Sequence, residues 1–83
     1  MKLRLKYFAM VREDIGQGTE EVHSNAAAVG ALRDELIARG GAYAQSLARG
    51  RAIRVSLNKT MCEESALLHE GDEVAFFPPV TGG

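Results

Sequence analysis

The sequence AAVGALRDELIAR, at residues 27–39, has the periodicity of an amphipathic helix. Val29, Leu32 and Leu36 recur at positions i, i+3 and i+7, and Ile37 widens the apolar stripe that they form. An apolar stripe on a helix is stable only when another element covers it. We therefore expect this helix to pack against the rest of a small domain.

The two ends of this helix carry signals of different clarity. Gly40 and Gly41 follow the last turn, where glycine commonly ends a helix. Either Ser24 or Asn25 would serve as the N-cap, and the pattern does not choose between them. The same periodicity places residues 33–35 on the solvent side.

Alternating apolar and polar residues on both sides of the helix predict strands. In residues 2–8, for example, Leu3, Leu5 and Tyr7 share one face, while Phe8 falls on the charged face. We expect strands at residues 2–8, 19–24, 52–58, 61–63 and 73–77, a helical turn near 11–15 and a short helix at 42–48.

This order of elements indicates an α+β fold of the ubiquitin-like β-grasp type. Two strands, a main helix and further strands form a mixed sheet of about five strands with the helix packed across one face. Pro78 and Pro79 cannot continue a central strand, because proline donates no ladder hydrogen bond. We expect a domain at residues 1–77 and an extended tail at residues 78–83.

Composition excludes several classes of function. The 83 residues suit one domain, and 46% hydrophobic and 25% charged residues are ordinary for a globular protein. A formal net charge of −1 lacks the basic excess that nucleic-acid binding needs, and no run approaches the roughly 18 apolar residues of a membrane span. The single cysteine fits a reducing compartment, so we expect a cytoplasmic protein without nucleic-acid or membrane partners.

Conventional catalytic and metal sites are not evident in the chain. His23, His69 and Cys62 lack the spacing of metal ligands, so we expect no metal site and no bound cofactor. Cys62 would need a histidine base to act as a nucleophile, and a half-buried structural cysteine is the commoner case. Adjacent carboxylates such as Glu20 and Glu21 point to opposite sides of a strand, and we interpret them as solvated charge.

The C-terminal tail is the strongest functional signal from the residues themselves. Pro78 and Pro79 give a stiff exit, Val80 and Thr81 follow, and the chain ends at two glycines, Gly82 and Gly83. Glycine has no Cβ and fits a channel too narrow for other residues. At about 3.3 Å per residue the tail spans roughly 20 Å, enough to carry a terminal carboxylate into a partner's active site. A frayed end is the alternative that composition leaves open.

Three apolar side chains are predicted to lie together on the outer face of the sheet. Phe8, Met61 and Phe77 fall on outward positions near the ends of strands that neighbour one another in a β-grasp sheet. Clustered exposed apolar side chains mark an interaction surface. The alternative is that a loop covers one or two of them.

The C-terminal run GDEVAFFPPVTGG, residues 71–83, strongly resembles the small subunits of molybdopterin synthase, the MoaD type of the MoaD/ThiS ubiquitin-like family. YFAMVRE at residues 7–13, the helix at 29–33 and the segment at 55–61 agree with this family. Met61 stands where the family often has leucine, a change of similar volume. The resemblance covers nearly the whole chain.

This resemblance implies a sulfur carrier that acts as the donor subunit of a two-subunit sulfurtransferase. An ATP-consuming, ubiquitin-activating-type adenylyltransferase would adenylate Gly83, and a desulfurase or rhodanese type of sulfur donor would convert it to a thiocarboxylate. The tail would then enter the large synthase subunit and give sulfur to cyclic pyranopterin monophosphate, forming the molybdopterin dithiolene. Phe8, Met61 and Phe77 would dock the body, Arg12 would add a polar contact, and the assembly would be a heterotetramer.

Three alternatives remain open from the sequence. One is a sulfur carrier of the same fold that supplies thiamin or cysteine synthesis. Another is a ubiquitin-like modifier that is joined to lysines. The third is a non-covalent adaptor that would tolerate the loss of Gly82 and Gly83.

Overall fold

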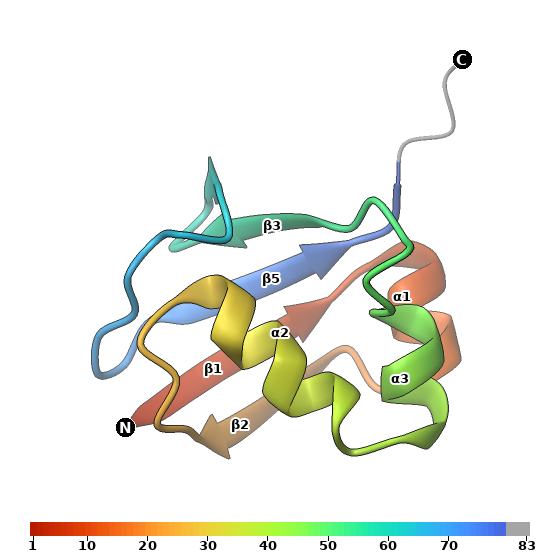
Figure 1. The fold of residues 1–83 in the computed structure, drawn as a ribbon, viewed down its shortest axis with the longest axis horizontal. Helices are drawn as coiled ribbons and strands as arrows, with labels where there is room; N and C mark the ends of the chain where they lie inside the picture. The colour runs from red at the N-terminus through yellow and green to blue at the C-terminus, as the bar shows by residue number, and fades with distance from the viewer. Residues whose placement is uncertain (80–83) are drawn as a thin grey trace.

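The computed structural model describes residues 1–79, and three helices accompany a five-stranded sheet in this part of the chain (Figure 1). Along the chain these elements are β1 (Lys2–Tyr7), α1 (Ala9–Ile15), β2 (Thr19–His23), α2 (Val29–Ile37), α3 (Gly41–Ser46), β3 (Arg54–Leu57), β4 (Thr60–Cys62) and β5 (Glu73–Phe77). Among these residues, no helix is long and apolar enough to cross a membrane.

The sheet has the mixed topology of a β-grasp fold. Its strand order is β2-β1-β5-β3-β4, and β1 pairs antiparallel with β2 but parallel with β5. β3 joins β5 and β4 through antiparallel pairs. Helix α2 crosses one face, and α1 and α3 lie at the end of the sheet where β5 ends (Figure 1). The predicted fold class is therefore confirmed.

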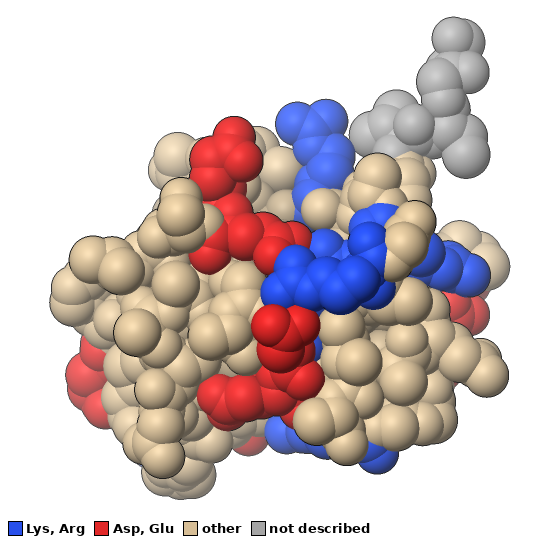
Figure 2. All heavy atoms as spheres, viewed as in Figure 1, with Lys and Arg blue, Asp and Glu red and all other residues tan. Residues whose placement is uncertain are grey.

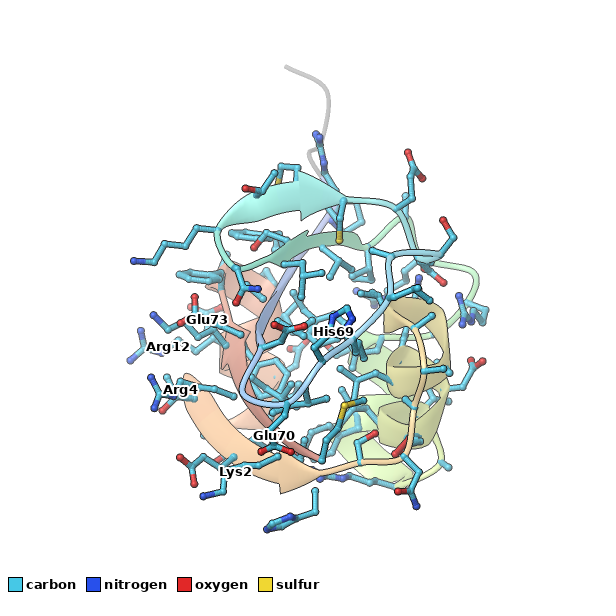
Figure 3. The ribbon with its side chains drawn as sticks, turned by 90° about the vertical axis from the view of Figure 1, so that its left-hand side faces the viewer. Lys2, Arg4, Arg12, His69, Glu70 and Glu73 are labelled. Atoms are coloured by element: carbon cyan, nitrogen blue, oxygen red, sulfur yellow. The ribbon has the colours of Figure 1, made fainter. Side chains whose placement is uncertain are left out.

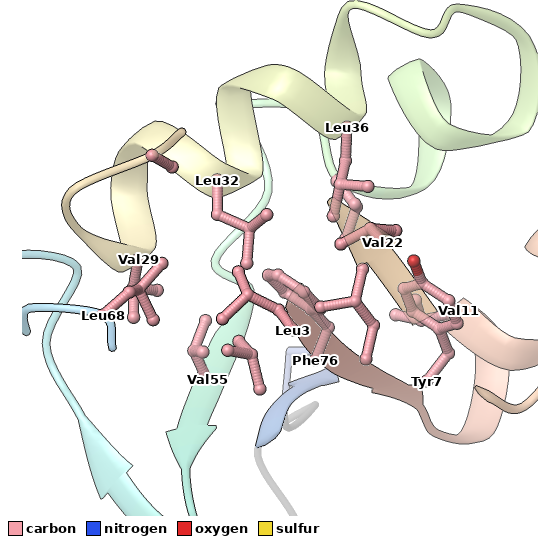
Figure 4. Packing of buried hydrophobic residues seen from close by; sticks show 14 residues of the cluster. Leu3, Tyr7, Val11, Val22, Val29, Leu32, Leu36, Val55, Leu68 and Phe76 are labelled. Atoms are coloured by element: carbon pink, nitrogen blue, oxygen red, sulfur yellow. The ribbon is translucent and has the colours of Figure 1, made fainter. Parts of the chain in front are cut away.

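The core lies between α2 and the sheet. The stripe of Val29, Leu32 and Leu36 is at most 2% exposed and faces Leu3 and Phe76 (Figure 4). Burying side chains of this size stabilises the fold by about 2 kcal/mol each. The predicted inward face of the first strand is also confirmed, because Leu3, Leu5 and Tyr7 are buried.

The start of α2 differs from the prediction. The helix begins at Val29 rather than Ala27, and neither Ser24 nor Asn25 caps it, because the N-cap residue is Ala28. A distant loop provides the missing partners: the Val29 N–H donates to the Ala66 carbonyl at 3.0 Å and the Gly30 N–H to the Glu64 carbonyl at 2.8 Å.

Gly30 lies inside this helix because the loop approaches it closely. A Cβ at this position would lie 3.1 Å from Glu64 Oε1 and 3.4 Å from the Glu64 carbonyl oxygen. Glycine inside a helix lowers the stability of the helix by about 1 kcal/mol relative to alanine. Here the cost is offset by the backbone contact that caps the helix.

Arg33 was predicted to face solvent, and this prediction is wrong. The residue is 3% exposed, and its guanidinium binds the loop between α3 and β3. Its Nε donates to the Leu47 carbonyl at 2.8 Å, and Nη2 donates to the carbonyls of Ala48 and Arg51 at 2.6 and 3.0 Å. Nη1 forms an ion pair with Glu64 at 2.6 Å. A charged residue is thus buried because every donor group has a partner.

Replacing Arg33 with methionine is expected to lower the free energy of unfolding by about 3 kcal/mol, since it leaves buried carbonyls without donors. Urea unfolding monitored by circular dichroism measures this loss. Arg51→Met is the control, because the Arg51 side chain is exposed and we expect less than about 0.5 kcal/mol. Equal losses in the two variants would contradict the role of Arg33.

Candidate functional site

Three apolar side chains meet on the face of the sheet opposite α2. Phe8, Met61 and Phe77 line one hollow of about 310 Å³, whose floor includes Ser56 and Ala75. The rings of Phe8 and Phe77 stack with their centroids 4.7 Å apart and their planes 3° from parallel. Phe8 is 40% exposed and Met61 48%. We call Phe8, Met61 and Phe77 the docking patch.

The alternation of side chains along β5 and its register with the neighbouring strands bring the residues of this patch together. Val74 and Phe76 of β5 point into the core, so Ala75 and Phe77 point outward. Ser56 of β3 lies between Ala75 and Met61 on the two neighbouring strands. Because these neighbours flank it, Ser56 is only 5% exposed although it lies on the outward face of β3.

The backbone of Phe8 joins the patch to β5. Its N–H donates to the Phe76 carbonyl at 3.1 Å, which holds the end of β1 beside the end of β5. The structure therefore brings together the three apolar residues among the four predicted for partner contact, at positions far apart in the sequence. That they contact a partner stays a prediction.

The patch lies at the root of the tail. Phe77 is the last residue of β5, and Pro78 and Pro79 follow it as half-buried residues outside any strand. Residues 80–83, which include the predicted sulfur-bearing Gly83 and its neighbour Gly82, lie outside the described residues. The division into a domain at residues 1–77 and a tail at residues 78–83 stays a prediction.

Arg12 lies on the same side of the sheet but in a separate hollow. It is an exposed residue of α1, and its side chain packs closely against Gly18, where a Cβ would lie 3.0 Å from Arg12 Nε. Figure 3 shows Arg12 projecting to the same side as Arg4 and Glu73, away from α2. The structure thus places Arg12 near the docking patch without making it part of the same hollow.

A family model described as the ThiS family matches residues 5–83 of this chain. The chain belongs to the ThiS family. Its relatives include the molybdopterin synthase sulfur carrier subunit of Escherichia coli (strain K12), which is 40% identical over 81 residues covering 98% of this chain and 99% of that protein. The corresponding subunit of Haemophilus influenzae is 37% identical over the same shares of the two chains.

Solved structures agree with this family assignment. SAMP1 from Haloferax volcanii superposes on this ThiS-family chain with a TM-score of 0.79 and 29% identity over 100% of both chains. Such a match shows that the two chains share the β-grasp fold.

The part of the ThiS-family chain that the structure describes offers no metal site. Among residues 1–79, no group of three histidine, cysteine or acidic side chains gathers closely enough to hold an ion. Cys62 is half-buried in β4, and burial together with the Glu63 charge raises the pKa of its thiol. A raised pKa keeps the thiol protonated, which argues against a nucleophilic role.

Glu20 was interpreted as solvated charge, and this interpretation is wrong. Glu20 pairs with Leu5 in the register of β1 and β2, so it lies on the inward face of β2. Strand alternation also places it on the same face as the buried Val22, two residues further along. Its carboxylate accepts hydrogen bonds from the hydroxyls of Tyr7 at 2.8 Å and Tyr43 at 2.6 Å. The same carboxylate binds two further side chains, Arg39 and Gln17, at 2.9 and 3.2 Å.

This cluster holds Glu20 in its charged form. Burial alone would raise the pKa of Glu20, but the hydrogen bonds from Tyr43, Arg39 and Tyr7 outweigh it and lower the pKa below its usual value. Burial and the Glu20 carboxylate in turn raise the pKa of Tyr7. The cluster ties β1, β2 and α3 together and is a structural element of the fold.

Glu20→Gln is expected to lower the free energy of unfolding at pH 7 by about 1–3 kcal/mol, because it removes a charged acceptor. A lowered folded-state pKa stabilises the protein fully above the unfolded-state value of about 4.3, and this contribution is lost as the pH falls through the folded-state pKa. The difference between wild type and variant should therefore shrink below about pH 4.3. Urea unfolding at several pH values tests this, and a difference that stays constant down to acid pH would contradict it.

Proposed function

We propose that this chain is the sulfur carrier subunit of a molybdopterin synthase. Gly83 is adenylated by an ATP-consuming, ubiquitin-activating-type enzyme, and the persulfide of a desulfurase or rhodanese type of donor displaces AMP to form an acyl disulfide. A cysteine thiol of one of these enzymes then attacks the donor's sulfur, so that the S–S bond breaks, a disulfide forms on the enzyme and the thiocarboxylate is released. The resulting thiocarboxylate donates sulfur to cyclic pyranopterin monophosphate to form the molybdopterin dithiolene. The carrier leaves as a carboxylate and is charged again.

One observation supports this function above all others. The docking patch, in which Phe8 and Met61 are exposed and Phe77 is half-buried, lies at the root of the tail. The chain also matches sulfur carrier subunits over nearly their whole length. A body that docks through this patch aims the tail that starts one residue later. The geometry suits delivery of a reactive terminus into a partner.

The chemistry of the proposal is divided between two proteins. A thiocarboxylate provides a nucleophilic sulfur without a cysteine, so Cys62 has no part in the reaction. We assign the groups that bind the pterin and transfer protons to the large synthase subunit. The relatives are named as one subunit of a synthase, which implies a second subunit. The chain is then the donor subunit of a sulfurtransferase and is not catalytic alone.

A ubiquitin-like modifier is the second candidate function. The similarity to SAMP1 supports it, since a second solved structure of this kind is named small archaeal modifier protein 1. A modifier uses the same activation of Gly83 but forms an amide with a lysine of another protein. It would therefore appear in cells as conjugates of higher mass.

The intact mass of the protein, purified from cells that hold its activating enzyme and sulfur source, tests the proposal. We expect a mass increase equal to sulfur replacing oxygen, localised by fragmentation to Gly83. An unmodified mass in cells that demonstrably contain both proteins would contradict sulfur transfer. Conjugates of higher mass would instead support the modifier.

A further inference from the structure

Positive charges are arranged differently on the two faces of the molecule. On the helix face, acidic and basic side chains lie next to each other (Figure 2). Arg33 pairs with Glu64 at 2.6 Å, Arg39 pairs with Glu20 at 2.9 Å, and Arg49 pairs with Asp34 at 2.9 Å. The cations of this face are thus largely neutralised within the chain.

The outer face of the sheet carries cations that, within the described residues, mostly lack such partners. They come from β1, α1, β3 and the turn after β3, and they are Lys2, Arg4, Lys6, Arg12, Arg54 and Lys59. Figure 3 shows Lys2, Arg4 and Arg12 projecting from this side. Within residues 1–79, one of the six forms an ion pair, Lys6 with Glu73 at 3.5 Å.

The acidic residues named on this face offset only part of its positive charge. Glu21 lies opposite Arg4 in the register of β1 and β2, but no ion pair joins them. Glu73 is already paired with Lys6, and the carboxylate of Glu70 accepts the backbone N–H of Lys2 at 3.1 Å. Each of these three carboxylates keeps its negative charge, but the six cations outnumber them, in a protein whose net charge is −1.

Three of these cations border the docking patch. Lys6 and Lys59 line the same hollow as the patch, and Arg54 lies directly opposite Phe77 in the register of β3 and β5. An apolar centre with a charged rim is typical of protein–protein interfaces.

We propose that the partner surface received by Phe8, Met61 and Phe77 carries carboxylates around an apolar pocket, and that Arg4, Arg12, Arg54 and Lys59 steer its approach. This inference rests on the proposed function and describes the large synthase subunit. Rim charges raise association rates by 10-fold or more at low salt and affect dissociation little. Fast association without slow release suits a carrier that has to be recharged after each transfer.

The test is the association rate constant with the cognate large subunit, measured by stopped flow from about 20 to about 300 mM salt. We expect wild type to associate about 10-fold more slowly at the higher salt. Arg4→Glu should lower the association rate about fivefold at low salt and flatten its salt dependence, with dissociation changed less than about twofold. Arg4→Gln should show an intermediate effect, and Arg54→Glu should act in the same direction.

Arg51→Glu is the matched control, because it changes the net charge equally at an exposed residue of the loop that Arg33 holds. It should alter the association rate less than about twofold. Salt-independent binding of wild type, or equal effects of Arg4→Glu and Arg51→Glu, would overturn the steering inference while the proposed function stands. No binding to the large subunit at all would overturn both. Loss of binding to anionic vesicles or single-stranded DNA in Arg4→Glu, without an effect on the large subunit, would show a different use of this face.

Discussion

Deletion of Gly83 is expected to reduce sulfur transfer by at least about 100-fold while the domain stays folded. The reacting carbonyl would recede by one residue, about 3.3 Å, and a displacement of even 1 Å from the productive position costs about 100-fold. The fold should not change, because β5 ends at Phe77 and the core lies between α2 and the sheet.

The measurement is single-turnover formation of molybdopterin from cyclic pyranopterin monophosphate, with the large subunit, the activating enzyme and a sulfur donor present. Gly83→Ala is the matched variant, because it keeps the length of the tail and adds one Cβ. A smaller loss of sulfur transfer in Gly83→Ala than in the deletion would show that the length of the tail matters more than the size of its last residue. If the deletion supports wild-type synthesis, Gly83 is not the sulfur-bearing residue.

Local alternation was sufficient to predict most of the sheet and the docking patch. Alternation along single strands placed Leu3 and Tyr7 on one face and Phe77 on the outer face. The structure confirms this, because Leu3 and Tyr7 belong to the core and Phe77 does not. Predicting that Met61 lies beside Phe77 and Phe8 also required the strand order of the β-grasp fold, because that order brings β4 next to β3. Periodicity together with a known strand order is thus enough when a residue's environment is set by its own element.

Periodicity failed where a distant segment determines the environment of a residue. Arg33 was assigned to solvent because its helix position is outside the apolar stripe, but the loop at residues 47–51 covers it with carbonyl oxygens. The start of α2 was misplaced because its cap comes from Glu64 and Ala66, more than thirty positions along the chain. Neither partner is marked by any local pattern.

Phe77→Arg is expected to weaken binding to the large subunit by at least about 100-fold. The side chain lies at the centre of the docking patch, stacked 4.7 Å from the ring of Phe8. A guanidinium at this position would be buried against an apolar surface without a partner, and central aromatic residues commonly account for 2–4 kcal/mol of binding. Titration calorimetry with the large subunit measures the dissociation constant.

Leu67→Arg is the matched control, since Leu67 is 63% exposed and pairs with Ala28, in the loop that caps α2, outside the hollow of the patch. It introduces the same charge in place of an apolar side chain, and we expect a change in affinity below about threefold. Phe77→Ala removes the ring without adding charge, so an intermediate loss would show that apolar contact itself stabilises the complex. Equal affinities of wild type and Phe77→Arg would contradict docking through this patch. The steering inference predicts that Phe77→Arg acts mainly on dissociation and Arg4→Glu mainly on association, because a central apolar contact forms after the encounter that rim charges accelerate.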